Sequence, residues 1–156
     1  MAVFVDVECF RPSSTWIIKE FAWYSLEDDH YESFCIMPSR GFHSFPGLIK
    51  KKLVHTSRNI HGIHWDEGDI SIVELCDHIE KLKLKYKVFY ANGKENCIFL
   101  KDLFHREFND VCVELTERKP MILCQYHISK SKQYWKHCSL NKCEMYRSFL
   151  KNGKVI

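Results

Sequence analysis

The stretch SIVELCDHIEKLKLKYKVFYA, residues 71–91, places a predicted helix directly before a predicted strand. Its first part, residues 71–85, has apolar side chains at the spacing of one helix face, namely Ile72, Leu75, Ile79 and Leu82. Ser71 and Glu74 form a capping-box pattern at the start of this helix. Residues 86–91 are rich in aromatic side chains, which is typical of a strand. A helix that leads into a strand indicates an α/β protein.

The residues before this stretch predict an antiparallel unit. Three runs are rich in β-branched and aromatic residues: AVFVDVECF (2–10), TWIIKEFAWYSL (15–26) and YESFCIMP (31–38). Short polar turns separate these runs, which predicts three strands joined as a meander. Residues 48–65 then predict a helix, or a helix followed by a loop.

The residues after the stretch continue the alternation. We expect a helix over residues 93–108, a short fifth strand over DVCVEL (110–115) and a last helix from Gln133 to Leu150. Candidate core residues of the last helix are Leu140, Tyr146 and Phe149. The order β-β-β-α-β-α-β-α predicts an α/β fold in which a mixed five-stranded sheet, three antiparallel strands and then β-α alternation, is flanked by helices. No repeat or linker divides the chain, so we expect residues 1–156 to form a single domain.

The composition indicates a globular protein of a reducing compartment. The chain is 46% hydrophobic and has 8 cysteines in 156 residues, too few for a small disulfide scaffold. Its start, MAVFVDVECF, lacks the basic residues and apolar run of a signal peptide, and no stretch approaches the ~20 apolar residues of a membrane helix. We therefore expect a cytoplasmic or nuclear protein whose thiols are free, buried or bound to metal. The net charge of +3 does not by itself indicate a partner.

The segment CQYHISKSKQYWKHC, residues 124–138, contains three candidate metal ligands: Cys124, His127 and Cys138. Thiolates and imidazole are ligands that zinc prefers, and a structural zinc site usually has four ligands. His61 and His64 could supply the fourth if their loop folds over the segment, whereas Cys143 would point about 140° away from Cys138 on a helix. His137 is expected to face solvent. The alternative interpretation is that the cysteines are small buried apolar residues and that His127 is a satisfied polar residue.

The order of the elements resembles the RNase H-like fold in its DnaQ branch of 3′–5′ exonucleases. Those enzymes begin with an Asp-x-Glu pair on the first strand, where this chain has Asp6 and Glu8. Two further acids that the resemblance implies are missing: VFYANGKENCIFL (88–100) has no Asp where the second motif places one, and His137 is followed by Asn141 and Lys142. Two-metal hydrolysis needs several carboxylates to hold two cations about 4 Å apart. We therefore do not expect bound Mg²⁺ or Mn²⁺.

The tail resembles a narrower family, the Maelstrom domain, which is DnaQ-like, lacks the acidic quartet and carries a Glu-Cys-His-Cys cluster associated with zinc. The C-x-x-H…Cys pattern of residues 124–138 carries this resemblance. The Glu of that family lies on the second strand, and the matching context in residues 16–42 implies Glu20 as the fourth ligand. A Glu flanked by apolar residues also needs a partner if it is buried. HGIHWDEGD (61–69) and VFYANGKENCIFL also resemble small stand-alone DnaQ-like proteins of arthropods.

The resemblance implies a catalytically degenerate domain with a structural zinc ion. A zinc ion with four protein ligands has no open position for an activated water. Such a domain would bind single-stranded RNA, or would scaffold protein partners of a small-RNA pathway that silences transposons, the piRNA pathway. The segment SKSKQYWKH mixes basic and aromatic residues that suit phosphate contact and base stacking: Lys130, Lys132, Tyr134, Trp135 and Lys136. The two aromatic rings could equally pack under the last helix.

Two other functions stay open. The first is a ribonuclease, for which no catalytic set is assigned. A metal-dependent version would use Asp6 and Glu8 with acids of the HWDEGD segment (Asp66, Glu67 and Asp69), and a metal-independent version would use His61 and His64 as general acid and base. HGIHWDEGD is also typical of a loop that caps the helix beginning near Ser71. The second is a protein-interaction module, which would bind no RNA even at low salt.

Overall fold

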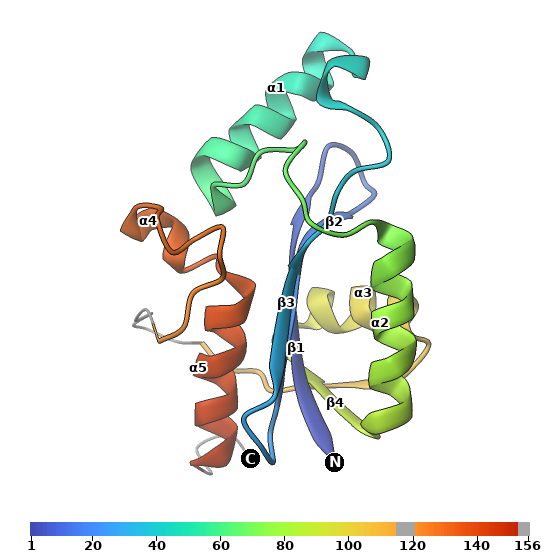
Figure 1. Ribbon diagram of the computed structural model, residues 1–156, viewed down its shortest axis with the longest axis vertical. Coiled ribbons are helices and arrows are strands. Elements are labelled where there is room, and N and C mark those ends of the chain that lie inside the picture. The colour runs from blue at the N-terminus through green and yellow to red at the C-terminus, as the bar shows by residue number, and fades with distance from the viewer. Residues whose placement is uncertain (115–120, 153–156) are drawn as a thin grey trace.

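A single mixed sheet organises the part of the chain that the computed structural model describes, residues 1–114 and 121–152 (Figure 1). Its five strands lie in the order β3-β2-β1-β4-β5. Their bounds are β1 Ala2–Phe10, β2 Ile17–Ser25, β3 Tyr31–Cys35, β4 Val88–Ala91 and β5 Phe108–Asp110. β1, β2 and β3 pair antiparallel, whereas β4 pairs parallel to β1 and β5 parallel to β4. The predicted mixed five-stranded α/β fold is confirmed, and the arrangement is consistent with an RNase H-like fold.

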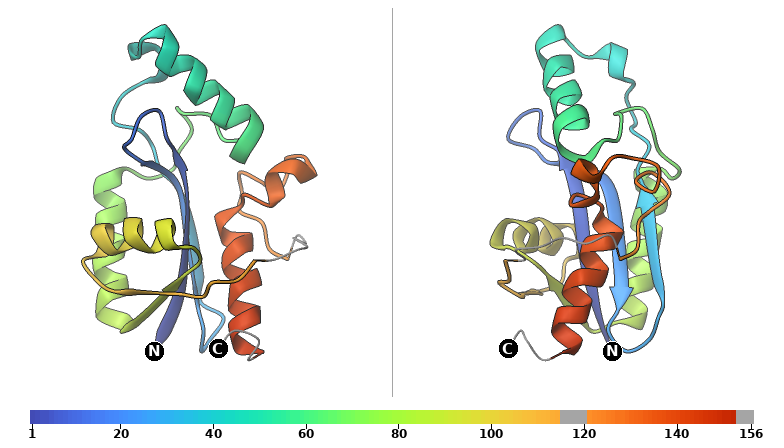
Figure 2. Two further views of the ribbon diagram at one scale, coloured as in Figure 1. Left: turned by 180° about the vertical axis from the view of Figure 1, so that it is seen from behind. Right: turned by 90° about the vertical axis from the view of Figure 1, so that its left-hand side faces the viewer.

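Helices cover both faces of the sheet (Figure 2). α2 (Ile72–Lys85) and α3 (Lys94–Phe104) lie on one face, and α5 (Ser139–Lys151) lies on the other. α1 (Gly47–Thr56) lies beyond one end of the sheet and continues into a π-helical turn, η2 (Ser57–His61). Two short pieces, η1 (Phe42–Ser44) and α4 (Lys132–Trp135), complete the set. Within the described ranges, no helix has the length and apolar character needed to cross a membrane.

The two faces of the sheet are buried in separate cores. Because side chains alternate along a strand, Val3, Val5 and Val7 of β1 pack toward α2 and α3, while Phe4 packs under α5. Asp6 and Glu8 continue the row that begins at Phe4, and they therefore also face α5. The same alternation on β2 directs Glu20 toward α5 and Lys19 toward the opposite side.

The start of α2 follows the sequence pattern closely. The Ser71 Oγ accepts a hydrogen bond from the backbone N–H of Glu74 at 3.1 Å, and the Glu74 carboxylate accepts one from the backbone N–H of Ser71 at 3.4 Å. Leu75, Ile79 and Leu82 are buried as predicted. The prediction that Ile72 is part of the buried face is wrong, because this first residue of the helix is 40% exposed.

Some predicted boundaries are also wrong. The last helix is not continuous from Gln133 to Leu150, because Cys138 has extended backbone (φ −72°, ψ 115°) and caps a new helix, α5. α3 ends at Phe104, which leaves Phe108 to begin β5.

β5 ends at Asp110 rather than at residue 115. The Asp110 carboxylate accepts hydrogen bonds from the backbone of Gly93 and of Cys112, and Cys112 adopts a left-handed conformation (φ 52°) that a strand cannot continue. Leu115, the last residue of the predicted strand, lies outside the described residues. On α5, Leu140 and Tyr146 are buried as predicted, whereas Phe149 is only partly buried.

Candidate metal centre

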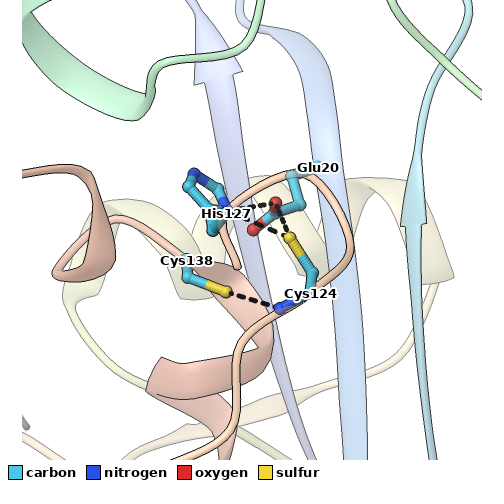
Figure 3. Close-up of side chains that lie close together, drawn as sticks. All are labelled: Glu20, Cys124, His127 and Cys138. Carbon is cyan, nitrogen blue, oxygen red and sulfur yellow. Dashed lines mark hydrogen bonds and ion pairs between the residues drawn. The ribbon is translucent and has the colours of Figure 1, made fainter. Parts of the chain in front are cut away.

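Four buried side chains converge between the sheet and the start of α5 (Figure 3). They are Glu20 on β2, Cys124 and His127 on the loop before α4, and Cys138 at the N-cap of α5. One ligand atom of each lies within 4.8 Å of all the others, and none of the four residues is more than 4% exposed. The structure therefore brings together the three residues of the C-x-x-H…Cys pattern and Glu20, which the resemblance implies.

Local backbone geometry explains why the loop residues meet. The backbone N–H of His127 donates to the carbonyl of Cys124 at 3.0 Å, so the C-x-x-H segment forms a turn with both side chains on one side. The backbone N–H of Cys124 lies 3.3 Å from the Sγ of Cys138 and donates to it. At the start of α5 the backbone N–H of Ser139 donates to the Glu20 carboxylate. An acceptor at this position is favourable because the first N–H groups of a helix have no partner within the helix.

The hydrogen bonds of His127 fix its tautomer. Its Nε2 lies 2.6 Å from the carbonyl oxygen of His61, which can only accept, so Nε2 carries a proton. Its Nδ1 faces the cluster, 3.0 Å from the Sγ of Cys124 and 3.1 Å from Oε2 of Glu20. A histidine held through one nitrogen by a carbonyl, with the other turned toward thiolates and a carboxylate, has the arrangement of a metal ligand with its supporting hydrogen bond.

A proton on His127 offsets part of the negative charge of this cluster. Burial opposes charge on His127, but hydrogen bonds with Cys138 and Glu20 raise the pKa of His127 to about 10. The pKa of Glu20 is lowered despite its burial, chiefly by His127. A hydrogen bond with Cys124 lowers the pKa of Cys138 to about 6, and the same contact with burial raises the pKa of Cys124 above its ordinary value. The four groups thus require a cation between them, either a proton or a metal ion.

The donor set fits a tetrahedral metal ion. Two thiolates, one imidazole and one carboxylate are ligands that zinc accepts, and soft thiolates disfavour Mg²⁺ and Ca²⁺. Because all four positions would be filled by the protein and the side chains are buried, such an ion would have no position for a reactive water. The arrangement suits a structural ion that ties together β2, the loop before α4 and α5.

The rival ligands lie elsewhere. The Sγ of Cys143 donates to the carbonyl of Ala22 at 3.4 Å, away from the cluster. His61 is fully buried and contributes its backbone carbonyl rather than its ring, and burial lowers its pKa to about 4. His64 belongs to the loop before α2, where its backbone N–H donates to Glu67 and its Nδ1 accepts from the backbone of Asp66. The expectation that His137 faces solvent is wrong, because its ring pairs with Glu8 and is only 24% exposed.

A second cluster lies beside the first and contains the Asp-x-Glu pair of β1. The Lys142 Nζ of α5 lies 2.8 Å from Oδ2 of Asp6 and 2.6 Å from Oε1 of Glu8. The Nδ1 of His137 lies 3.3 Å from the same Glu8 oxygen. Burial raises the pKa of Asp6 to about 6 even though Lys142 opposes the shift, whereas Lys142 and His137 lower the pKa of Glu8 to about 2 against the effect of burial.

The acids of the HWDEGD segment do not join this cluster. Asp66 accepts a hydrogen bond from the backbone of Phe42, Glu67 from the backbone of His64, and Asp69 from the backbone of Cys35. These three bonds tie the loop before α2 to itself, to η1 and to the end of β3, whereas the start of α2 is capped by Ser71 and Glu74.

The basic and aromatic segment forms α4 and its flanks. The ring of Tyr134 packs against Gly62, and its hydroxyl donates to the carbonyl of Arg58 at 2.6 Å. Trp135 is partly buried, with its Nε1 atom buried. Tyr134 is thus placed to hold α4 against η2. Lys136 is exposed and Lys130 partly buried, while the side chain of Lys132 lies outside the described residues.

Sequence reasoning missed the roles of Lys142 and His137. The sequence carries only the four-residue spacing from Cys138 to Lys142, which puts both residues on one side of a helix but does not indicate the contact with Glu8. The structure shows the corresponding bond, from the backbone N–H of Lys142 to the carbonyl of Cys138, on the side of α5 that faces the sheet. A lysine on the sheet-facing side of a helix needs buried acids as partners, and Asp6 and Glu8 were the acids that β1 offered.

Comparison with known proteins gives no further assignment: no protein-family model matches the sequence, and no curated protein matches it either.

Proposed function

We propose that this chain is a catalytically degenerate DnaQ/Maelstrom-like domain, held together by a structural zinc ion, that binds single-stranded RNA or scaffolds proteins of a small-RNA pathway. The observation that carries the proposal is the buried group of Glu20, Cys124, His127 and Cys138. Its composition and its place on β2 and before the last helix agree with the cluster that the Maelstrom resemblance implies.

Zinc is proposed as a structural ion because of what the four ligands join. Glu20 lies 104 residues from Cys124 along the chain, and Cys138 begins the helix that covers one face of the sheet. A bound ion would cross-link these segments and would stabilise the folded chain through its binding free energy. It would organise the region beside the incomplete acidic set, where the missing carboxylates leave no two-metal centre.

Metal analysis of the purified protein tests the zinc site. We expect about one zinc ion per chain, and we expect both Glu20→Ala and Cys138→Ser to lose it. Cys143→Ser is the matched control, because Cys143 is a fully buried cysteine on the same helix whose thiol donates to the backbone carbonyls of Phe4 and Ala22, away from the four ligands. A parent protein that contains no zinc, or variants that still bind zinc, would contradict the proposed zinc site.

RNA binding is supported by the resemblance and by the basic residues around α4. Lys136 is exposed there, and Lys130 lies in the preceding turn. Fluorescence anisotropy with a labelled single-stranded RNA should show binding that weakens as salt rises, because phosphate contacts release counterions. Lys130→Ala with Lys136→Ala should reduce both the affinity and the salt slope, whereas Lys51→Ala on the exposed side of α1 is the control. Absence of binding at low salt would leave the protein-scaffold role.

A metal-independent ribonuclease is a second candidate, because one observation favours it. Glu8 holds the Nδ1 of His137, and both residues line one cleft. A histidine oriented by a carboxylate is an effective general base, which in RNA would take the proton of a 2′-hydroxyl. Cleavage that resists EDTA, is lost in His137→Gln and persists in His64→Ala would support this activity. Cleavage that EDTA abolishes would instead require a metal-dependent centre.

A further inference from the structure

A cleft of about 410 Å³ opens beside the end of β1 and is distinct from the Glu20 cluster. Asp6, Glu8, His137 and Lys142 line it together with Asn92, Asn96 and residues of η2 and of the loop after β1. Its polar lining gathers at the point where the two carboxylates of β1 meet the helix α5. The cleft therefore presents an acidic pair, a histidine and an ammonium group to whatever enters it.

The two carboxylates cannot stay charged and buried without a cation. Asp6 is 3% exposed and the side chain of Glu8 is 11% exposed, and the two residues are on the same side of one strand. Burying like charges next to one another is costly unless a positive charge lies between them. In proteins that charge is supplied by a divalent cation or by a basic side chain.

Lys142 supplies this charge from within the chain. Its Nζ is shared between Asp6 and Glu8, at 2.8 and 2.6 Å, and the residue is only 8% exposed. Its position is fixed, because its backbone bonds to Cys138 in the first turn of α5. The ammonium group thus contacts one oxygen of each carboxylate, which is how a single bridging cation would contact them.

We propose that Lys142 is a tethered substitute for a divalent cation, and that Asp6 and Glu8 form a latent site for Mg²⁺ or Mn²⁺ that becomes available when the ammonium group is removed. In the parent protein the ammonium group then keeps divalent cations out of the cleft. Any other ligand of the cleft binds there independently of divalent ions. Two carboxylates and a cleft with room for water are the environment in which such hard cations bind. The inference concerns a cluster other than the zinc ligands and stands independently of them.

Lys142→Met tests the proposal, because methionine keeps much of the side-chain length and removes the charge. Binding of Mn²⁺ to the purified protein is followed by electron paramagnetic resonance and by calorimetry. We expect Lys142→Met to bind Mn²⁺ about tenfold or more tightly than the parent, and the double variant Lys142→Met, Glu8→Gln to lose this gain. Lys142→Arg keeps the positive charge and should resemble the parent.

Thermal unfolding gives a second readout that also covers a variant that folds poorly. Mn²⁺ should raise the melting temperature of Lys142→Met and leave that of the parent unchanged, since an ion that binds only the folded state stabilises it. If Lys142→Met does not fold alone, recovery of the fold on addition of millimolar Mn²⁺ supports the proposal. Failure of Mn²⁺ to bind, stabilise or rescue the variant overturns it, as does equally tight binding of Mn²⁺ by the parent.

Discussion

Glu8 on β1 and Glu20 on β2 lie directly opposite one another in the antiparallel pairing of these strands. Like charges in such a position repel, because opposite side chains are about 5 Å apart. This repulsion is offset because each carboxylate contacts its own positively charged groups. Lys142 and His137 contact Glu8, whereas His127 and the N-terminus of α5 contact Glu20. Two polar sites can therefore share one face of the sheet under a single helix.

Zinc binding should release about two protons per ion at neutral pH. Without metal, the pKa of His127 is about 10 and that of Cys124 is above its ordinary value, so both groups are protonated at pH 7, whereas Cys138, with a pKa of about 6, is largely a thiolate. The ion must displace the two protons that remain. The apparent zinc affinity should thus rise about a hundredfold per pH unit near neutrality and fall as the pH is lowered.

Calorimetry in buffers of different ionisation enthalpy counts these protons. Cys143→Ser, which keeps all four ligands, is the matched variant and should release the same number of protons as the parent. A binding enthalpy that does not depend on the buffer would contradict the protonation states given for the metal-free cluster.

Metal removal should loosen η2 before it loosens α2. The ring of His127 donates to the carbonyl of His61, and the backbone N–H of Ile63 donates to the Nδ1 of His61 at 3.1 Å, so the metal ligand supports the end of η2 directly. Hydrogen exchange after chelation should accelerate at the amide of Ile63 much more than at the amide of Ile79 within α2. Equal acceleration at both amides would mean that the ion supports the whole domain and not this connection.

The sequence allowed the fold to be predicted where local signals agree with one another. The capping box of Ser71 and Glu74 starts α2 at the residue where it was expected. The break between α4 and α5 was missed, because nothing in the residues around Cys138 forbids a helix, and it is the contacts of Cys138 and Ser139 with Cys124 and Glu20 that impose the new start.

The candidate sites could likewise be predicted from local signals only in part. Cys124 and His127 are three residues apart and could be paired from spacing alone, whereas Glu20 was named as a ligand only through the resemblance to the Maelstrom domain. Lys142 meets Glu8 across 134 residues of chain, and no local pattern encodes such a contact. Contacts of this kind are set by the strand order and by the path of α5, which only the folded structure reveals.

Gly62→Ala should destabilise the protein by about 1–3 kcal/mol. Gly62 has a left-handed backbone (φ +71°), and a Cβ atom at this position would lie 2.7 Å from the ring of Tyr134. Urea unfolding should show a smaller loss when the substitution is made in Tyr134→Ala, because only the backbone cost then remains. Gly47→Ala is the control, since nothing lies within 4 Å of a Cβ atom there. An unchanged stability in Gly62→Ala would mean that η2 and α4 do not pack as described.

Lys19→Met should cost about 1–3 kcal/mol of unfolding free energy, the range found when a buried hydrogen-bonding group loses its partner. Lys19 is 2% exposed, and its Nζ donates to the carbonyl of Ile36 at 3.0 Å, to that of Trp65 at 2.6 Å and to that of Glu67. Methionine fills a similar volume but removes the donor that these three carbonyls share, so the end of β3 and the loop before α2 lose their common anchor. Lys51→Met, at an exposed position of α1, is the control and should change stability by less than about 0.5 kcal/mol. Chemical denaturation of the two variants beside the parent checks the prediction, and a Lys19→Met protein as stable as the parent would show that the ammonium group does not hold the loop.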